Sequence, residues 1–222
     1  PGTCVIRVPD ELTDEEVAPA NCALATVVAG WDAIEIQPFE NVLIQGAGAL
    51  GVYAAALARH YGCRRIIVAD VMEHRLDFVK QFGATDTINS KDRSDDEVIG
   101  MVKDLTGGFG ADVVMELAGF PPLLPLGLKC LRTGGRLVEI GNAFAGANFN
   151  CDASDIVFKR LTIKGIHNYD TIHLQKGIDF LQMARKLFPF EKIVGERVSL
   201  DEINTGLKIA ESGRTIRVAV KP

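Results

Sequence analysis

The stretch N-V-L-I-Q-G-A-G-A-L-G, residues 41–51, joins an apolar run to a glycine-rich turn. The apolar run at 41–45 predicts a buried strand, and the residues that follow the turn predict a helix over 49–61. A strand that leads through a G-x-G-x-x-G turn into a helix is typical of the first unit of a doubly wound α/β fold.

Each glycine of the turn has a physical task. Gly46 permits the tight bend, Gly48 lets a pyrophosphate approach the backbone, and Gly51 lets the helix pack closely on the strand. The helix begins at Ala49 and Leu50, where free N–H groups and the positive end of the helix dipole favour an anion. The turn therefore predicts a dinucleotide site.

Asp70 supports this interpretation, because it follows Gly51 by 19 residues and ends the next predicted strand. A carboxylate there accepts hydrogen bonds from the ribose hydroxyls of adenosine and repels a 2′-phosphate, so NAD is favoured over NADP. Other doubly wound nucleotide binders remain as rivals. The chief one, a methyltransferase that uses S-adenosylmethionine, also binds a ribose through an acidic residue at the end of a strand. It is disfavoured by the sixth strand and by the terminal segments.

Apolar runs alternate with amphipathic stretches through the middle of the chain. This alternation predicts an α/β fold, a Rossmann doubly wound six-stranded parallel sheet. The expected strands are 41–45, 65–70, 85–89, 112–117, 136–140 and 161–165, and the expected helices are 49–61, 73–82, 95–105, 123–131 and 153–159.

The two chain ends differ from this pattern. The N-terminal end offers a strand at 4–8, a capped turn at Thr13 and the start of an apolar helix, while the C-terminal end offers a helix and then a strand, a helix and a strand. They do not continue the parallel alternation, so we expect remnants of a second domain. The predicted divisions are 1–23 and 168–222 for these remnants and 24–167 for the nucleotide-binding domain.

Composition limits the class of protein. The 222 residues are 47% hydrophobic and 24% charged, which is ordinary for a soluble globular protein and excludes a disordered chain or a coiled coil. The formal net charge of −5 without a basic run disfavours nucleic acid as a partner. No apolar run approaches the roughly 20 residues that span a bilayer. The expected partners are small molecules and other subunits.

Five cysteines, an odd number without a C-x-x-C pair, predict free thiols in a reducing compartment and hence a cytoplasmic location. The chain begins with Pro1 next to a predicted strand. We therefore expect that the natural N-terminus, with any targeting signal, lies upstream.

Beyond these patterns, the sequence resembles the zinc-type medium-chain dehydrogenase/reductase family, which includes alcohol, sorbitol and threonine dehydrogenases, over its whole length. The resemblance rests on P-D-E-L-T-D-E-E (9–16), C-A-L-A-T (22–26), V-L-I-Q-G-A-G-A-L-G (42–51), F-G-A-T-D (82–86), E-L-A-G (116–119) and S-G-R-T-I-R (212–217). The runs P-A-N-C-A-L-A-T and G-I-H-N-Y look most like the alcohol dehydrogenases associated with phosphonate catabolism.

The resemblance implies roles for individual residues. Cys22 stands where family members place the third protein ligand of a catalytic zinc, and Thr26 where a side chain packs on the nicotinamide. Arg75 stands where a basic group flanks the adenosine, and Arg217 matches an arginine that pairs with the pyrophosphate. Backbone at the strand ends would border the nicotinamide, at Ala118, Gly141, Asn142 and His167. From the residues alone, a small buried hydrophobe is the commoner role for Cys22. Arg217 has a surface arginine as its alternative, and His167 fits a loop histidine equally well.

The resemblance also implies NAD and zinc as cofactors and a small alcohol or aldehyde as substrate. In the family, zinc lowers the pKa of the bound alcohol, and a hydride then moves to C4 of the nicotinamide. The other zinc ligands and the proton relay come from an N-terminal β-rich, GroES-like catalytic domain. We therefore expect this chain to bind NAD but to lack a complete zinc site, and to be inactive by itself.

Two other functions stay open. A zinc-free, quinone-reductase-like oxidoreductase is disfavoured by Cys22 and Asp70, since that branch usually prefers NADPH and lacks the cysteine. A non-catalytic NAD-binding module fits the sequence as well. In each case we expect a homodimer or homotetramer through the strand at 161–165, because that strand would otherwise leave an apolar sheet edge exposed.

Overall fold

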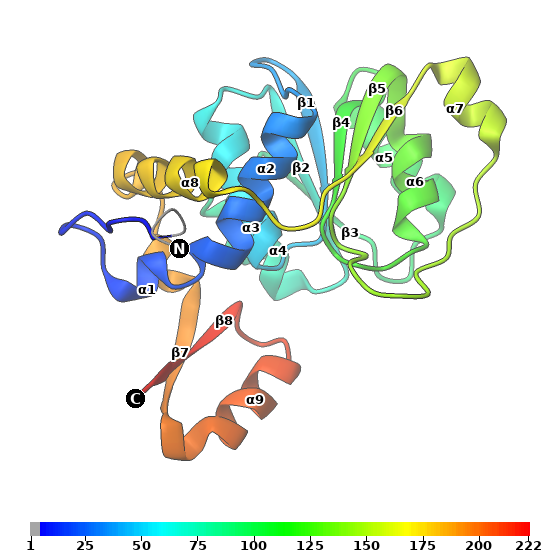
Figure 1. The fold of residues 1–222 in the computed structure, drawn as a ribbon. Coiled ribbons are helices and arrows are strands. Elements are labelled where there is room, and N and C mark those ends of the chain that lie inside the picture. The colour runs from blue at the N-terminus through cyan, green and yellow to red at the C-terminus, as the bar shows by residue number, and fades with distance from the viewer. Residues whose placement is uncertain (1–4) are drawn as a thin grey trace.

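The computed structural model describes residues 5–222 and contains the predicted six-stranded parallel sheet, with strand order β3-β2-β1-β4-β5-β6 (Figure 1). The chain crosses from one half of the sheet to the other after β3, so β1 and β4 are neighbours at its centre. The α/β doubly wound prediction is confirmed. The strands are β1 (Asn41–Gln45), β2 (Arg65–Asp70), β3 (Asp86–Asn89), β4 (Ala111–Glu116), β5 (Leu131–Glu139) and β6 (Thr162–Gly165).

Helices cover both faces of this sheet (Figure 1). Alternate residues of one strand enter different cores: Ile44 packs in the same apolar cluster as Tyr53, whereas Leu43 packs with Val98 and Leu124. No helix among residues 5–222 is long and apolar enough to span a membrane. The first cluster is covered by α2 (Ala25–Ala33), α3 (Ala49–His60) and α4 (Glu73–Lys80), and the second by α5 (Asp95–Leu105), α6 (Leu123–Cys130) and α7 (Ala153–Lys159).

The C-terminal segment forms a second, smaller sheet. The strands β7 (Val194–Ser199) and β8 (Arg217–Lys221) pair in parallel, and helix α9 (Ile203–Glu211) connects them. The expectation that the chain ends do not continue the parallel alternation is therefore only half right, since this unit is itself a parallel β-α-β unit outside the main sheet. The remaining elements are α1 (Asp14–Val17), the π-helical turn Ala20–Leu24, α8 (Thr171–Ala184), and the 3-10 helices Phe190–Lys192 and Leu200–Glu202.

The expected strand at 4–8 is not a strand in its described part. Residues 5–8 have no regular secondary structure, and Cys4 lies outside the described residues. Val5 is 79% exposed, and no strand of residues 5–222 lies beside this segment to share hydrogen bonds. A β-branched sequence needs such a neighbour before it forms a strand.

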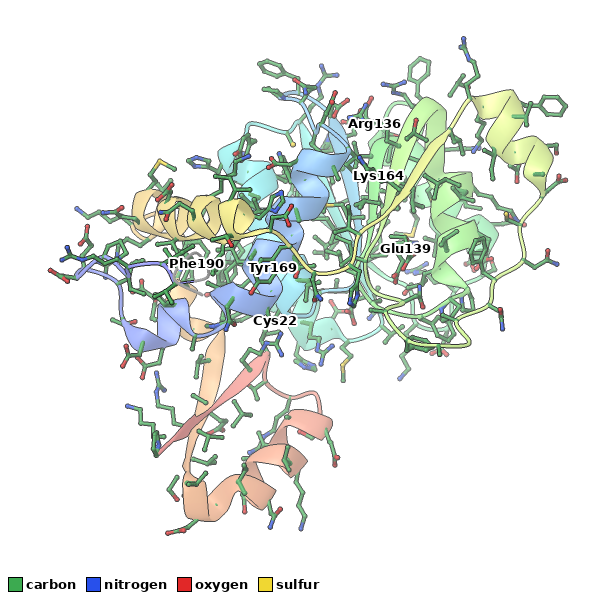
Figure 2. The ribbon with its side chains drawn as sticks, in the orientation of Figure 1. Cys22, Arg136, Glu139, Lys164, Tyr169 and Phe190 are labelled. Carbon is green, nitrogen blue, oxygen red and sulfur yellow. The ribbon has the colours of Figure 1, made fainter. Side chains whose placement is uncertain are left out.

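An aromatic cluster attaches the C-terminal segment to the main domain. Phe190 is fully buried, and its ring centroid lies 5.9 Å from that of Tyr53 on α3 and 5.9 Å from that of Phe82 (Figure 2). Phe180 of α8 meets the same ring edge-on at 5.7 Å. The second sheet is therefore connected to the first through a packed apolar core.

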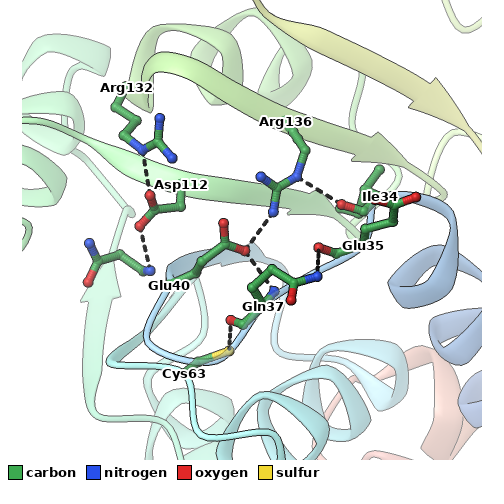
Figure 3. A network of polar contacts seen from close by, with 9 residues as sticks. Ile34, Glu35, Gln37, Glu40, Cys63, Asp112, Arg132 and Arg136 are labelled. Atoms are coloured by element: carbon green, nitrogen blue, oxygen red, sulfur yellow. Dashed lines mark hydrogen bonds and ion pairs between the residues drawn. The ribbon is translucent and has the colours of Figure 1, made fainter.

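Ion pairs close the amino edge of the main sheet (Figure 3). Arg136 of β5 donates to Glu40 at 2.6 Å and to the carbonyl of Ile34 at 2.8 Å. Asp112 of β4 accepts from the backbone N–H of Asn41 at 2.7 Å and pairs with Arg132. These contacts fix β1, β4 and β5 together at the edge opposite the turn at 46–51.

We expect Gly51→Ala to lower the free energy of unfolding by about 2–3 kcal/mol, because a Cβ there would lie 1.9 Å from the carbonyl oxygen of Gly46. Gly100→Ala is the matched control, since a Cβ in the middle of α5 meets nothing within 4 Å. That variant should gain about 0.5–1 kcal/mol from helix propensity. Urea denaturation of both variants measures the difference, and equal stabilities would contradict the close approach of α3 to β1.

Candidate functional site

A cavity of about 380 Å³ opens at the carboxyl edge of the main sheet, where the first crossover turn, the end of β2 and the end of β4 meet. Three of the predicted cofactor residues line it, namely Gly46, Asp70 and Ala118. The rest of the lining is not among the predicted cofactor residues: Leu43 and Gln45 belong to the strand of the motif at 41–51, and no motif marks the others. Its members are Leu43, Gln45, Ala69, Val71, Ser90, Arg93, Asp95, Val98, Phe120, Leu123 and Leu126.

The glycine turn has the geometry that the sequence requires. Gly46 has a φ of +104°, and a Cβ on it would lie 3.0 Å from the backbone of Ala118. Gly48 is the N-cap of α3 and provides no side-chain hydrogen bond, and the space beside it is open. The first-turn N–H groups at Ala49, Leu50 and Gly51 therefore remain available to an anion.

Asp70 is held in place by the backbone on both sides. Its Oδ2 accepts from the N–H of Ala47 in the glycine turn at 2.7 Å, and its Oδ1 accepts from the N–H of Met72 at 2.9 Å. An ionised carboxylate has about four lone-pair positions, so both oxygens can still accept a hydroxyl. Asp70 is thus a fixed acceptor at the mouth of the cavity.

The two predicted arginines lie between the main sheet and the C-terminal segment. Arg75 donates to the carbonyl of Gly213 at 3.4 Å, and His74 contacts the same carbonyl at 2.9 Å. Arg217 lies close enough to Tyr53 of α3 to affect its pKa: burial raises the pKa of the Tyr53 hydroxyl, and the charge of Arg217 opposes this shift. Within residues 5–222, the Nε atoms of Arg75 and Arg217 are buried without an acceptor. Each side chain therefore carries one donor that the described residues leave unpaired.

Ala118, Gly141 and Asn142 lie together at the ends of β4 and β5. The N–H groups of Ala118 and Gly119 donate to one oxygen of Glu116, at 3.0 and 2.9 Å. The N–H of Asn142 donates to Glu139 at 3.0 Å. The pKa of Glu116 is raised to about 7. Burial is the larger cause, and the neighbouring carboxylate of Glu139 is the second.

Glu116 and Glu139 have no predicted role, although they are the last residues of β4 and β5. The one signal that could have found them is that two successive parallel strands reach the carboxyl edge with a glutamate. Their loops approach closely, since a Cβ on Gly141 would lie 2.3 Å from the backbone nitrogen of Gly119.

His167 does not line the same cavity as Gly46 and Asp70. It is exposed and lines a separate hollow of about 400 Å³ after β6, together with residues of α2 and α8. Tyr169 and His173 lie in the same hollow. His167 therefore shares no cavity with Gly46 and Asp70 that would support its predicted contact with the cofactor.

Cys22 lies on the π-helical turn before α2, with its side chain exposed (Figure 2). The hydroxyl of Thr26, one turn later, donates to the carbonyl of Cys22 at 2.6 Å. No group of three or more histidine, cysteine or acidic side chains within the described part of the chain could hold a metal ion. A catalytic zinc needs three protein ligands, so Cys22 by itself does not fit one.

Comparison with known proteins places this arrangement in a family. The profile of the zinc-binding dehydrogenase family matches residues 49–183. L-threonine 3-dehydrogenase of Legionella pneumophila is 32% identical over 98% of this chain, and the chain spans 62% of that relative's length. 5-exo-hydroxycamphor dehydrogenase of Pseudomonas putida is 29% identical over 99% of the chain and 61% of its own length.

Solved structures agree with the relatives. An alcohol dehydrogenase from Thermotoga maritima superposes with a TM-score of 0.91 and 30% identity, over 98% of this chain and 60% of that one. Benzyl alcohol dehydrogenase from Acinetobacter calcoaceticus gives 0.87 and 27%, over 97% and 59%. The family profile begins within the glycine turn, at Ala49, and includes the strand-end Asp70, and the chain belongs to the zinc-binding dehydrogenase family.

Proposed function

We propose that this chain is the NAD-binding part of a zinc-dependent alcohol or polyol dehydrogenase, an enzyme that transfers a hydride between an alcohol and NAD. The observation that carries the proposal is Asp70, fixed by the N–H of Ala47 beside the open N-terminus of α3. The alcohol and threonine dehydrogenases among its relatives support the reaction class. Residues 24–167 would form the NAD domain, and residues 1–23 and 168–222 would belong to a catalytic domain.

The cofactor would lie along the carboxyl edge of the sheet. Its pyrophosphate would meet the N–H groups at the start of α3, with Arg217 as a further donor. Asp70 would accept from the adenosine ribose while Arg75 flanks it, and the adenine would enter the cavity towards Arg93. The nicotinamide would lie over the loops that follow β4 and β5, with Thr26 against one face of the ring.

The metal chemistry of the proposed enzyme needs more zinc ligands than this chain brings together around Cys22. A zinc supplies Lewis-acid activation of the alcohol oxygen when it is bound. Cys22 would provide one thiolate to it. Residues 5–222 place no second and third ligand beside that thiol, so the part of the reaction that we assign to this chain is cofactor binding and orientation.

A reducing compartment such as the cytoplasm fits the thiols of the described residues. Cys22, Cys63, Cys130 and Cys151 are free. Burial raises the pKa of Cys63 and of Cys130 to about 12, which keeps both as unreactive thiols.

NAD should bind to the chain about tenfold or more tightly than NADP, because the carboxylate of Asp70 repels a 2′-phosphate. Asp70→Asn should narrow this preference, and Asp201→Asn, at an exposed aspartate on the 3-10 helix before α9, should leave it unchanged. Isothermal titration calorimetry with both dinucleotides measures the ratio. An equal or reversed preference in the unsubstituted chain would refute the ribose assignment.

Purified chain should contain well below one zinc ion per molecule, since Cys22 lacks the further ligands that a tight site needs. Elemental analysis after dialysis against a weak chelator measures this content, and Cys22→Ser should not change it. A stoichiometric, tightly held metal that disappears in Cys22→Ser would show that the site is complete within this chain.

The chain should form a homodimer or homotetramer through β6, because all of Thr162–Gly165 is exposed and Ile163 presents an apolar side chain there. Ile163→Lys should shift the species in sedimentation velocity towards monomer. Ile172→Lys, at a position 57% exposed on α8, is the control and should not. A monomer for the unsubstituted chain at micromolar concentration would argue against this edge as an interface.

A further inference from the structure

Three polar side chains form one row across the carboxyl end of the main sheet. Gln45 of β1 pairs in register with Glu116 of β4, and Glu116 pairs in register with Glu139 of β5. Directly paired residues of parallel strands point to the same face, so all three side chains lie on the face that α6 covers. Glu139 is labelled at the end of its strand in Figure 2. Two acidic side chains are thus neighbours below the loops that border the proposed nicotinamide position.

The two glutamates are connected through Asn142. Its Nδ2 donates to Glu116 Oε2 at 3.2 Å and to Glu139 Oε1 at 3.0 Å. Glu116 is fully buried, and its other oxygen accepts the N–H groups of Ala118 and Gly119. Glu139 Oε2 is also buried, and no donor among the described residues reaches it. A proton between the two carboxyl groups would give that oxygen its missing partner.

Within residues 5–222, the elements packed around the pair bring no cation to it. On β1 the neighbour is the neutral Gln45. Lys129 of α6 is exposed, and Lys159 of α7 donates to carbonyls that include Leu131, at the opposite end of β5. Lys164 of β6 is in register with Val138 and donates to Ala33 O. Of the charged groups that the structure describes, Glu139 is accordingly the one that acts on Glu116.

We propose that Glu116 and Glu139 are positioning residues that share one proton and thereby hold the loops after β4 and β5 in place for the nicotinamide. This proposal rests on the proposed function, because it takes those loops as the border of the nicotinamide. Neither glutamate reacts with substrate. Their task is to fix the backbone N–H groups of Ala118, Gly119 and Asn142.

The pair gives cofactor binding a pH dependence of predictable sign. The pKa of Glu116 is raised from 4.5 to about 7 by burial and by Glu139. Below that pH the pair carries one negative charge and one bridging proton. Above it the proton leaves to solvent, two carboxylates face each other in a buried site, and their repulsion separates the two loops. Dinucleotide affinity should then fall.

The charge of the nicotinamide ring should make the pH dependence of binding differ between NADH and NAD⁺. NADH has a neutral ring, whereas the oxidised ring of NAD⁺ is positive and attracts the second carboxylate. NADH affinity should therefore fall more steeply with rising pH than NAD⁺ affinity. A purely structural role for the pair would change both affinities alike.

Stability without cofactor gives an independent measurement. Because the folded state raises the pKa of Glu116, it binds the proton more tightly than the unfolded chain does. The pair's contribution to stability is complete below the usual value of 4.5 and is lost as the pH rises towards about 7. The melting temperature of the cofactor-free chain should fall across this window.

The test is a titration of the full chain with NADH, followed by its fluorescence, at several values from about pH 6 to about pH 8.5, and a parallel calorimetric titration with NAD⁺. For the unsubstituted chain, NADH affinity should fall about three- to tenfold over this range, and NAD⁺ affinity should fall less. Glu116→Gln mimics the protonated pair, since its oxygen still accepts the two backbone N–H groups and its amide donates to Glu139. Its NADH affinity should stay constant, and so should its melting temperature.

Glu211→Gln, at an exposed glutamate ending α9, is the control and should follow the unsubstituted chain at every pH. A pH dependence of NADH affinity that survives in Glu116→Gln, or equal slopes for NADH and NAD⁺, would overturn the proposal. Absence of dinucleotide binding at every pH would refute the proposed function instead. The melting curves would then still show whether Glu116 and Glu139 share a proton.

Discussion

Parallel pairing of the six strands decides where every other feature of this protein lies. It brings all amino ends to one edge and all carboxyl ends to the other. The amino edge is closed by ion pairs such as Arg136 with Glu40. At the carboxyl edge the loops approach one another closely: Gly46 and Gly119 have φ values of +104° and +73°, and a Cβ on either would meet backbone atoms at 3.0 Å or less. Free N–H groups and uncompensated carboxylates therefore gather at the carboxyl edge.

The C-terminal segment contributes to that edge although it lies outside the main sheet. The carbonyl of Gly213 meets both His74 and Arg75 at the start of α4, and the chain continues directly into β8 with Arg217 as its first residue. Phe190 anchors the start of the same segment against α3. A cofactor along the carboxyl edge would thus contact residues from both sheets, so its binding would stiffen the connection between them.

Local patterns allowed much of this to be predicted from the sequence. The glycine turn and the strand-end Asp70 depend on residues close along the chain, and the structure has both of them. The pairing of Glu116 with Glu139 depends on strand register, which no local pattern specifies. Residues 5–8 have the composition of a strand, but strand formation needs a neighbour that the described chain does not place beside them.

A buried glutamate beside a half-buried one needs hydrogen-bond donors to offset the lost hydration of their carboxylates, and the contacts show how many are present. Hydrogen bonds to a charged group contribute about 1.5–3 kcal/mol each, and Glu116 and Glu139 receive bonds from the N–H groups of Ala118, Gly119 and Asn142 and from one side-chain amide. Those bonds can balance one buried carboxylate, whose desolvation costs several kcal/mol. No donor or cation is left for a second charge, because Glu139 Oε2 has no partner among the described residues. A pair that shares one proton is the state that these contacts support, and a cationic ring above it is the ligand that would best tolerate the loss of that proton.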